Sequence, residues 1–223
     1  MDERIPGEAL AGGAVAPPAG SGAPRIGVLA LQGDVLEHVR MLRGAGAEVV
    51  VVKRPEQLES LAGLVIPGGE STTIGKLAEM YGLLEPLRKR ISEGLPAFGT
   101  CAGAILLSRQ ALAHDGSPSP QPLIGVLEAT TRRNAFGRQV ASFEADLEVA
   151  GLDGAPLHAV FIRAPWFEQV GDGVSVLASV ATPAGDKVVV VQAGTVLASA
   201  FHPELTGDDR LHRMFVDMVR AAG

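Results

Sequence analysis

The most constraining feature of this sequence is a continuous apolar run at residues 26–31, Ile-Gly-Val-Leu-Ala-Leu. A strand with only apolar side chains is typical of a sheet covered on both faces, because a strand with one face in water alternates apolar and polar residues. A polar turn at residues 32–34 ends the run, and residues 35–43 follow with apolar side chains at helical spacing. A buried strand that leads directly into a helix predicts an α/β fold with a parallel sheet.

The same order of elements repeats along the first half of the chain. Short apolar segments precede helical ones, and Gly82 and Pro86 interrupt the helical stretch that begins near Ser71. The expected strands are residues 26–31, 49–52, 64–66 and 96–98, and the expected helices are residues 34–43, 71–92 and 104–112. We expect Asp34 and Ser71 to cap the N-termini of their helices.

The second half of the chain is richer in β-structure. Short segments of β-branched and aromatic residues alternate with turn residues, which predicts strands. These strands are expected at residues 123–131, 140–149, 157–163, 174–180, 187–192 and 195–200, and a closing helix is expected at residues 208–219. The predicted fold class is α/β, with three layers: an open, mostly parallel sheet with helices on both faces, and added β-strands in the C-terminal half.

The length of 223 residues suits one domain of ordinary size. We expect a single domain at residues 25–223 and a disordered tail at residues 1–24, because the tail is rich in Ala, Gly and Pro. The tail has neither the basic start nor the continuous apolar stretch of a signal peptide. Residues 113–122 hold three prolines and are expected to form a surface loop.

Composition argues against several classes of function. A formal net charge of -6 disfavours a nucleic-acid binder, which needs a clustered positive surface. No apolar run approaches the length of a bilayer crossing, so we expect no membrane partner. The single cysteine, Cys101, cannot form an internal disulfide, and this favours a reducing, cytoplasmic location.

Cys101 lies in a predicted strand-to-helix turn, Gly99-Thr100-Cys101-Ala102-Gly103. This run is the thiol counterpart of the G-x-S-x-G turn, in which glycines allow a sharp bend that holds a nucleophile at the carboxyl end of a sheet. The backbone N–H of Ala102 would then point to where an oxyanion forms. A lone cysteine can instead be a small buried hydrophobe. The flanking glycines and the strand–helix context favour the nucleophile.

His202 follows an apolar strand and precedes a proline, in Phe201-His202-Pro203-Glu204. Residues two apart on an extended segment project to the same side, so Glu204 can accept a hydrogen bond from the imidazole. A base and its orienter are the other two parts of a cysteine triad. The alternative is a strand end with a solvated glutamate, and the cysteine turn makes that interpretation the weaker one.

Other polar residues are expected to have structural roles. His38 lies on the polar face of its predicted helix and His212 on the closing helix, so both are expected to face solvent. Asp208 and Asp209 are interpreted as the start of the closing helix rather than as a metal site.

A second glycine turn, Pro67-Gly68-Gly69-Glu70-Ser71, follows another predicted strand. Its backbone N–H groups could supply a second oxyanion donor. A phosphate-binding loop is the competing interpretation and it fails, because five residues separate Gly69 from Gly75 and Leu77 replaces the hydroxyl that magnesium requires. A plain turn with a helix cap stays open.

These motifs together resemble class I, triad-type glutamine amidotransferases, and within them the glutaminase subunits of deoxyxylulose-independent pyridoxal 5′-phosphate synthases. The resemblance covers about residues 25–221. It is carried by Leu31-Gln32-Gly33, Pro67-Gly-Gly-Glu-Ser-Thr-Thr73, Phe98-Gly-Thr-Cys-Ala-Gly103, Arg133-Asn-Ala-Phe-Gly-Arg-Gln139, Phe161-Ile-Arg-Ala-Pro165 and Phe201-His-Pro-Glu-Leu-Thr206. The cysteine and histidine runs mark the broad superfamily, and the segments that start at Pro67, Arg133 and Phe161 narrow it to these subunits.

The resemblance implies a flavodoxin-like fold and a role for each motif residue. Cys101 would be the nucleophile, and His202 and Glu204 would complete the triad. The residues implied to line the glutamine site are Gly69, Glu70, Ser71, Arg133, Ile162 and Arg163. Gly69 and Ala102 would form the oxyanion hole, with Gln32 and Gly33 as candidates for gating it. No cofactor and no metal are implied.

The implied reaction is the hydrolysis of L-glutamine to L-glutamate and ammonia. The ammonia would pass to a (β/α)8-barrel synthase subunit, which joins it to a pentose phosphate and a triose phosphate to form pyridoxal 5′-phosphate. Such glutaminases are largely inactive without the synthase, so low activity of the isolated chain is expected.

Charge matching indicates how a free amino acid could be held. Either Arg133 or Arg163 suits the α-carboxylate of glutamine, and Glu70 suits its α-ammonium group. Either arginine could instead form a surface ion pair. Two other classes of function stay open: a different cysteine hydrolase on the same fold, and a non-catalytic regulatory subunit with an idle triad.

Overall fold

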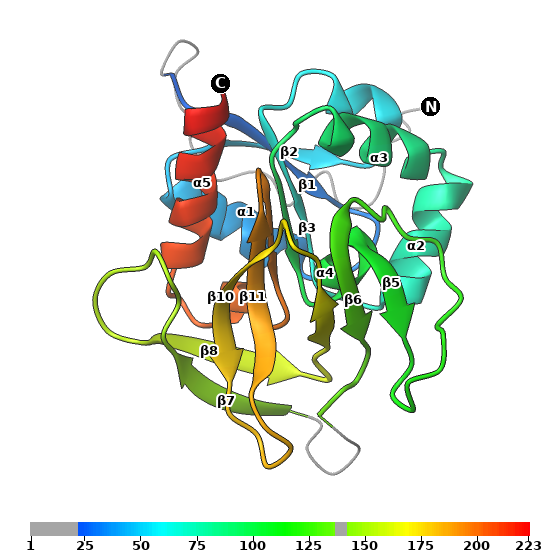
Figure 1. Cartoon of the computed structure of the whole chain (residues 1–223). Helices are drawn as coiled ribbons and strands as arrows, with labels where there is room; N and C mark the ends of the chain where they lie inside the picture. The colour runs from blue at the N-terminus through cyan, green and yellow to red at the C-terminus, as the bar shows by residue number, and fades with distance from the viewer. Residues whose placement is uncertain (1–21, 137–141) are drawn as a thin grey trace.

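A computed structural model describes residues 22–136 and 142–223 of the chain (Figure 1). The expected tail falls outside the described residues up to residue 21, and so do residues 137–141, which include the end of the motif that begins at Arg133. The described residues form a ten-stranded sheet and a separate two-stranded ribbon. The order in the sheet is β2 (Glu48–Val52), β1 (Arg25–Leu29), β3 (Gly63–Ile66), β4 (Ala97–Thr100), β12 (Val196–Ser199), β11 (Lys187–Ala193), β9 (Trp166–Val170), β6 (Leu127–Arg132), β5 (Ser108–Leu112), with β10 (Ser175–Val180) paired to β11.

The first five strands in this order are all parallel to their neighbours. Every residue of β3, β4 and β12 is buried, and so is every residue of β1 except Arg25. The apolar run at residues 26–31 therefore does mark a strand covered on both faces, because a side chain on either side of it meets a helix layer. The predicted parallel α/β sheet is confirmed.

Helices cover both faces of the parallel strands (Figure 1). One face carries α1 (Val35–Gly44) and α5 (Arg210–Ala222), which pack against each other. The other face carries α2 (Ser71–Met80), α3 (Leu84–Ser92) and α4 (Ala102–Leu107). The described part of the chain also contains two short 3₁₀ helices, η2 (Pro55–Leu58) and η3 (Pro203–Leu205). Within the described ranges, no helix combines the length and the apolar character that a bilayer crossing demands.

The added strands of the C-terminal half continue the sheet in mixed orientation. β11 runs antiparallel to β12, β10 and β9, β9 runs antiparallel to β6, and β5 is parallel to β6. The ribbon of β7 (Ser142–Leu147) and β8 (Leu157–Ile162) lies below this half of the sheet in Figure 1. The three-layer arrangement and the added strands agree with the expected fold class.

The ribbon is anchored by aromatic side chains that also hold the segment before His202. Phe161 stacks on Phe143 with ring centroids 4.4 Å apart and meets Phe201 at 5.3 Å. The backbone N–H of His202 donates to Val160 O at 3.0 Å. Because Phe161 and Phe201 are both fully buried, the end of β8 is fixed against the chain that follows β12.

The expected helix over residues 104–112 is wrong in its second half. α4 ends at Leu107 and residues 108–112 form β5. Ser108 adopts an extended conformation, and its hydroxyl donates to Ala104 O at 2.9 Å, which satisfies a carbonyl at the helix end. Pairing with β6 then satisfies the backbone of β5. The apolar periodicity of α4 does not show where the helix gives way to a strand.

β9 was not among the expected strands, and β6 begins at Leu127 rather than at residue 123. β9 carries two polar side chains in succession, Glu168 and Gln169, so it lacks a clear strand alternation. Its pairing with β6 places Trp166 opposite Arg132. Long-range pairing, rather than local pattern, decides this strand.

The expectation that His38 and His212 face solvent is wrong. Both residues are fully buried between α1, α5 and the sheet. His38 Nδ1 lies 2.9 Å from His212 Nε2, so each imidazole meets a polar partner that lies far away in the sequence. A histidine among polar residues of an amphipathic pattern can thus belong to the buried face when the facing helix supplies a partner.

The two expected helix caps are also corrected. Asp34 stands at the N-cap of α1, but its side chain makes no capping hydrogen bond. Glu70, and not Ser71, caps α2, because its carboxylate accepts hydrogen bonds from the N–H groups of Thr72 and Thr73. The Ser71 hydroxyl donates to Gln121 Oε1 at 3.1 Å.

Candidate active site

A cavity of about 320 Å³ opens at the carboxyl ends of the parallel strands. This edge is where open α/β sheets bind ligands. The cavity is lined by Gln32, Asp34, Gly69, Glu70, Ser71, Cys101, Ile105, Arg133, Asn134, Ile162, Arg163, His202 and Leu205. The structure therefore brings together side chains from the turns after β1, β3, β4, β6, β8 and β12.

Cys101 sits in a sharp turn between β4 and α4 with φ 47° and ψ -101°. A non-glycine residue adopts a positive φ only when its surroundings hold it there. A Cβ on Gly103 would lie 2.0 Å from Ile66 O, and a Cβ on Gly99 would lie 2.6 Å from Gly103 C. The two glycines are thus required because α4 packs directly on the backbone of β3 and β4.

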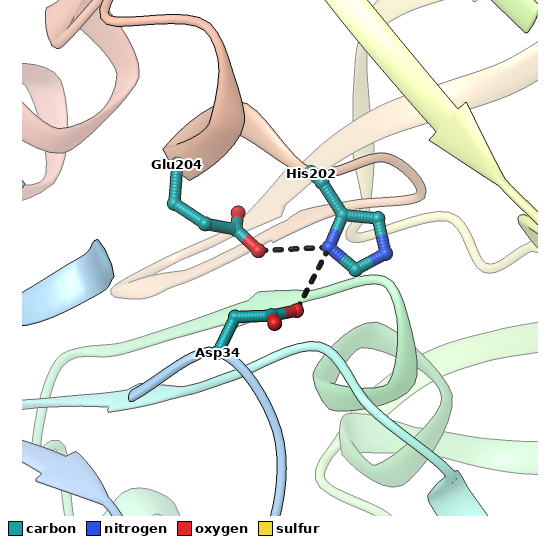
Figure 2. A group of neighbouring side chains, drawn as sticks. All are labelled: Asp34, His202 and Glu204. Carbon is teal, nitrogen blue, oxygen red and sulfur yellow. Dashed lines mark hydrogen bonds and ion pairs between the residues drawn. The ribbon is translucent and has the colours of Figure 1, made fainter. Parts of the chain in front are cut away.

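His202 leaves the end of β12 and is 6% exposed, and its ring faces two carboxylates (Figure 2). Its Nδ1 lies 2.8 Å from Glu204 Oε1 and 3.4 Å from Asp34 Oδ2. Only the Glu204 contact has hydrogen-bond geometry, so the Nδ1 proton belongs to that bond and the Asp34 contact is an ion contact. Nε2 is the ring nitrogen left for the Cys101 sulfur.

The charges around His202 favour its protonated form. Burial lowers the pKa of His202, but Asp34, Cys101 and Glu204 outweigh burial and hold that pKa well above the ordinary value. Burial raises the pKa of Glu204, and the hydrogen bond from His202 opposes that rise. A positively charged imidazole beside a sulfur is the partner that a thiolate needs.

The two turns that follow β1 and β3 are fitted tightly against each other. A Cβ on Gly33 would lie 1.7 Å from Gly68 O, and a Cβ on Gly68 would lie 2.4 Å from His202 Cε1. The N–H of Glu70 donates to Gln32 Oε1 at 2.7 Å, and Gly69 has φ +150°. The side chain of Gln32 therefore holds the backbone of the second turn next to Cys101.

Glu70 and Arg133 form an ion pair in the wall of the cavity. Arg133 Nη2 donates to Glu70 Oε1 at 2.7 Å, and Arg133 Nη1 donates to Ser119 Oγ at 3.0 Å. Burial raises the pKa of Glu70, but the bonds from Thr73 and Thr72 and the charge of Arg133 hold that pKa below its ordinary value. Glu70 is consequently an ionised cap of α2 with a paired guanidinium.

The other residues expected in the site divide into those that line the cavity and those behind it. Ile162 and Arg163 line it, and Arg163 has a positive φ of 45°. Glu204 lies behind His202, and the buried Ala102 lies behind Cys101, so neither side chain reaches the cavity wall. Gly33 also lies outside the lining, and its backbone packs closely against Gly68.

Four lining residues were not expected: Asp34, Ile105, Asn134 and Leu205. Two of them could have been predicted from their positions in the sequence. Asp34 follows Gln32 and Gly33 in a turn at the end of a buried strand, and Leu205 directly follows Glu204. Asn134 has φ 46° and directly follows Arg133, at a position where an asparagine tolerates the left-handed region better than most residues do.

The ligand atoms of Asp34, His202 and Glu204 lie within 4.8 Å of one another. This group could hold a metal ion by distance alone. Both carboxylates, however, face the same nitrogen, Nδ1, and Glu204 already accepts its hydrogen bond. A metal would have to displace that bond, so the donor arrangement fits an oriented imidazole better than a metal centre.

A strained cysteine turn that shares a cavity with a buried His–Glu pair, on a mostly parallel sheet, is the arrangement of a cysteine-dependent amidotransferase. The comparisons with known proteins agree with this class. The chain belongs to the SNO glutamine amidotransferase family, whose family model matches residues 28–221. The resemblance found in the motifs is thereby confirmed.

Several curated relatives are highly similar. The pyridoxal 5′-phosphate synthase subunit PdxT of Nocardia farcinica is 59% identical over 211 residues, which cover 94% of this chain and 92% of the relative. The subunit of the same name from Frankia alni is 60% identical over 200 residues, which cover 90% of this chain and 97% of the relative.

Solved structures share the fold. A crystal structure described as a glutamine amidotransferase is 55% identical, with a TM-score of 0.79, and covers 87% of this chain and 98% of that chain. The PurLQS structure from Thermotoga maritima is 16% identical with a TM-score of 0.62, covers 87% of this chain and 97% of that chain, and supports the fold alone.

Proposed function

We propose that this chain hydrolyses L-glutamine to L-glutamate and ammonia, with Cys101 as nucleophile, His202 as acid and base, and Glu204 as orienter. The observation that carries the proposal is the shared cavity of Cys101 and His202, with Glu204 bonded to the far nitrogen of the imidazole. Membership of the glutamine amidotransferase family supports the same reaction. No cofactor and no metal take part.

The reaction runs in two halves. The Cys101 sulfur attacks the side-chain amide carbon of glutamine, and the N–H groups of Gly69 and Ala102 stabilise the resulting oxyanion. The Nε2 proton of His202 goes to the leaving nitrogen, which departs as ammonia and leaves a thioester. His202, now neutral, takes a proton from water, the hydroxide breaks the thioester, and glutamate leaves with the sulfur restored.

The wall formed by Glu70 and Arg133 suits the other end of the substrate. A free amino acid carries an α-carboxylate and an α-ammonium group side by side, and the Glu70–Arg133 pair offers the two opposite charges at 2.7 Å. Arg133 or Arg163 takes the carboxylate and Glu70 takes the ammonium group. Ser71 and Ile162 line the same cavity.

The ammonia is passed to a (β/α)8-barrel synthase subunit for pyridoxal 5′-phosphate formation, in the cytoplasm. The names of the curated relatives, which are synthase subunits, support such a partner, and the single cysteine suits a reducing compartment. Gln32 and Gly33 gate the oxyanion hole: Gln32 Oε1 holds the N–H of Glu70, so reordering of this turn by the partner would change the backbone at Gly69.

The test is glutamate release from glutamine with and without the co-purified synthase, for the wild type and Cys101→Ala. We expect release that rises with the synthase and falls by at least about a thousandfold in Cys101→Ala. His158→Ala is the control, because His158 is exposed on the ribbon and pairs there with Asp146. An unchanged rate in Cys101→Ala would refute the triad.

Two further measurements separate the remaining functions. A general cysteine hydrolase would cleave asparagine or simple esters as well as glutamine, because it would not depend on the Glu70–Arg133 wall. A regulatory subunit with an idle triad would bind the synthase and release no glutamate in any combination. Each of these results contradicts the proposal.

A further inference from the structure

A buried row of polar side chains continues beyond the proposed triad, on the side of Glu204 away from His202. Figure 2 shows one carboxylate oxygen of Glu204 turned toward the imidazole and the other turned away. The second oxygen, Oε2, is buried and has no hydrogen-bond partner among the described residues. His38 Nε2 approaches it to 3.5 Å and lies 3.0 Å from Thr100 Oγ1.

His38 is held in turn by His212 from α5. The Nδ1 of His38 lies 2.9 Å from Nε2 of His212, and both rings are fully buried. The other nitrogen of His212, Nδ1, is buried and has no partner among the described residues. Thr100, at the end of β4, completes the surroundings of His38, and its neighbour in the chain is Cys101.

The tautomers of both rings follow from these contacts. If His38 donated from Nδ1, His212 would have to carry its proton on the unpartnered Nδ1, and a buried donor without an acceptor is costly. The lone pair of His38 Nε2 would then also face a carboxylate oxygen. In the opposite arrangement, His212 Nε2–H donates to His38 Nδ1, and His38 Nε2–H points to Thr100 and Glu204.

Burial favours the neutral form of both rings at neutral pH. Burial, followed by the charges of His212 and His202, holds the pKa of His38 well below its ordinary value. Burial lowers the pKa of His212 to about 4, against a small opposing effect of Asp209. A neutral His38 has one N–H, which Thr100 Oγ1 accepts at 3.0 Å, and the outer oxygen of Glu204 lies 3.5 Å from the same nitrogen.

We propose that His38 is a positioning residue for the triad: its Nε2–H, hydrogen-bonded to Thr100, places the positive end of its dipole beside the outer oxygen of Glu204 and so keeps this carboxylate ionised and aimed at His202. The inference rests on the proposed function, because it assigns no separate activity to His38. His212 is the residue that fixes the tautomer of His38. The distance of 3.5 Å is longer than an ordinary hydrogen bond, so the N–H dipole acts mainly through space.

The consequence is a change in the pH profile rather than a plain loss of activity. Without the N–H of His38, the outer oxygen of Glu204 faces no donor in a buried site, and the carboxylate takes up a proton at higher pH. A neutral glutamic acid no longer stabilises the imidazolium of His202. The acid limb of the pH–activity profile should therefore shift to higher pH.

The experiment compares His38→Leu and His38→Gln in the assembled enzyme, by glutamate release between pH 5 and pH 9. Leucine fills the space without a donor, and glutamine keeps an N–H near the position of Nε2. We expect His38→Leu to shift the acid limb upward by about one pH unit, with about a tenfold loss of kcat on that limb and little change in KM. His38→Gln should recover most of the shift.

Leu42→Ala is the matched control, because Leu42 lies one turn further along α1, is fully buried and is not one of the partners of Glu204. It should lower stability without moving the acid limb. If His38→Leu fails to fold, His212→Phe replaces it: an aromatic ring still occupies the site, the donor to His38 is lost, and a smaller shift in the same direction is expected.

A second readout needs neither glutamine nor the synthase. The rate at which iodoacetamide alkylates Cys101 in the isolated chain should show the same upward shift on its acid limb, because Glu204 supports the imidazolium beside the sulfur. If the acid limbs of the pH profiles are identical in wild type, His38→Leu and His212→Phe, the inference is overturned. An inactive Cys101→Ala in the same series would still uphold the proposed function. An active Cys101→Ala would overturn both.

Discussion

At the scale of single residues, Asp34 and Glu204 compete for one nitrogen of His202. Glu204 Oε1 lies 2.8 Å from Nδ1 and takes its proton, while Asp34 Oδ2 lies 3.4 Å away. Glu204 is buried, but the side chain of Asp34 is 40% exposed and belongs to the turn that also carries Gln32. The charge on His202 is therefore set partly by a loop that a partner could reach.

Asp34→Asn should lower stability across the acidic to mildly alkaline range. Asp34 helps to raise the pKa of His202 to about 12 on folding, so the contribution of this contact is lost only as pH rises toward the folded value. Removing the Asp34 charge should cost about 1 kcal/mol at pH 5.5 and a similar amount at pH 9, because both lie below the folded pKa. Urea unfolding at both pH values measures this, and a cost that disappears at pH 9 would contradict it.

At the scale of elements, the start of α2 joins helix capping to substrate recognition. The Glu70 carboxylate accepts the N–H groups of Thr72 and Thr73 and also pairs with Arg133. One side chain thus satisfies orphan donors of the first helical turn and connects α2 to the end of β6. The same carboxylate faces the cavity.

Substitutions of Glu70 should separate these two roles. Glu70→Gln keeps an acceptor for the cap but loses the charge, so KM for glutamine should rise about tenfold while the free energy of unfolding changes by less than about 1 kcal/mol. Glu70→Ala should raise KM similarly and cost a further 1 kcal/mol or so of stability. Steady-state kinetics of the assembled enzyme and urea unfolding check both variants. A normal KM in Glu70→Gln would exclude Glu70 from the α-ammonium site.

At the scale of the whole molecule, the neutral pair of His38 and His212 connects α1 to α5 across the end of the sheet. Protonation of either ring would place a positive charge in the buried interior, which is unfavourable. The folded pKa of each is below its unfolded value, so the unfolded chain binds more protons once the pH drops below about 6.5. The slope of stability with pH is then positive, and the protein loses stability as the solution becomes acidic.

The free energy of unfolding should therefore fall by about 1 kcal/mol for each pH unit between pH 6.5 and pH 4 for each neutral buried histidine. His212→Phe should reduce this slope without raising stability at pH 7, because it removes a partner of His38. Urea titrations at half-unit steps measure the slope in both proteins. An identical slope in His212→Phe would show that other groups cause the acid sensitivity.

Much of the fold follows from local pattern. The run at residues 26–31 predicts a strand covered on both faces, and the structure places β1 between the parallel strands β2 and β3. The turn at Cys101 can also be predicted from the sequence, because small residues such as Gly99 and Gly103 are needed where a helix packs directly on the strand before it. The contact of His202 with Glu204 follows from a spacing of two residues and a proline between them.

Local periodicity and turn chemistry, which act within a few residues, are enough to predict the parallel sheet, the cysteine turn and the His202–Glu204 pair. Packing between distant elements is what makes His38 and His212 buried partners 174 residues apart, turns Asp34 toward His202 instead of the cap of α1, and pairs Glu70 with Arg133. A polar side chain takes the nearest partner that packing supplies, and a local pattern does not identify a partner from a distant element.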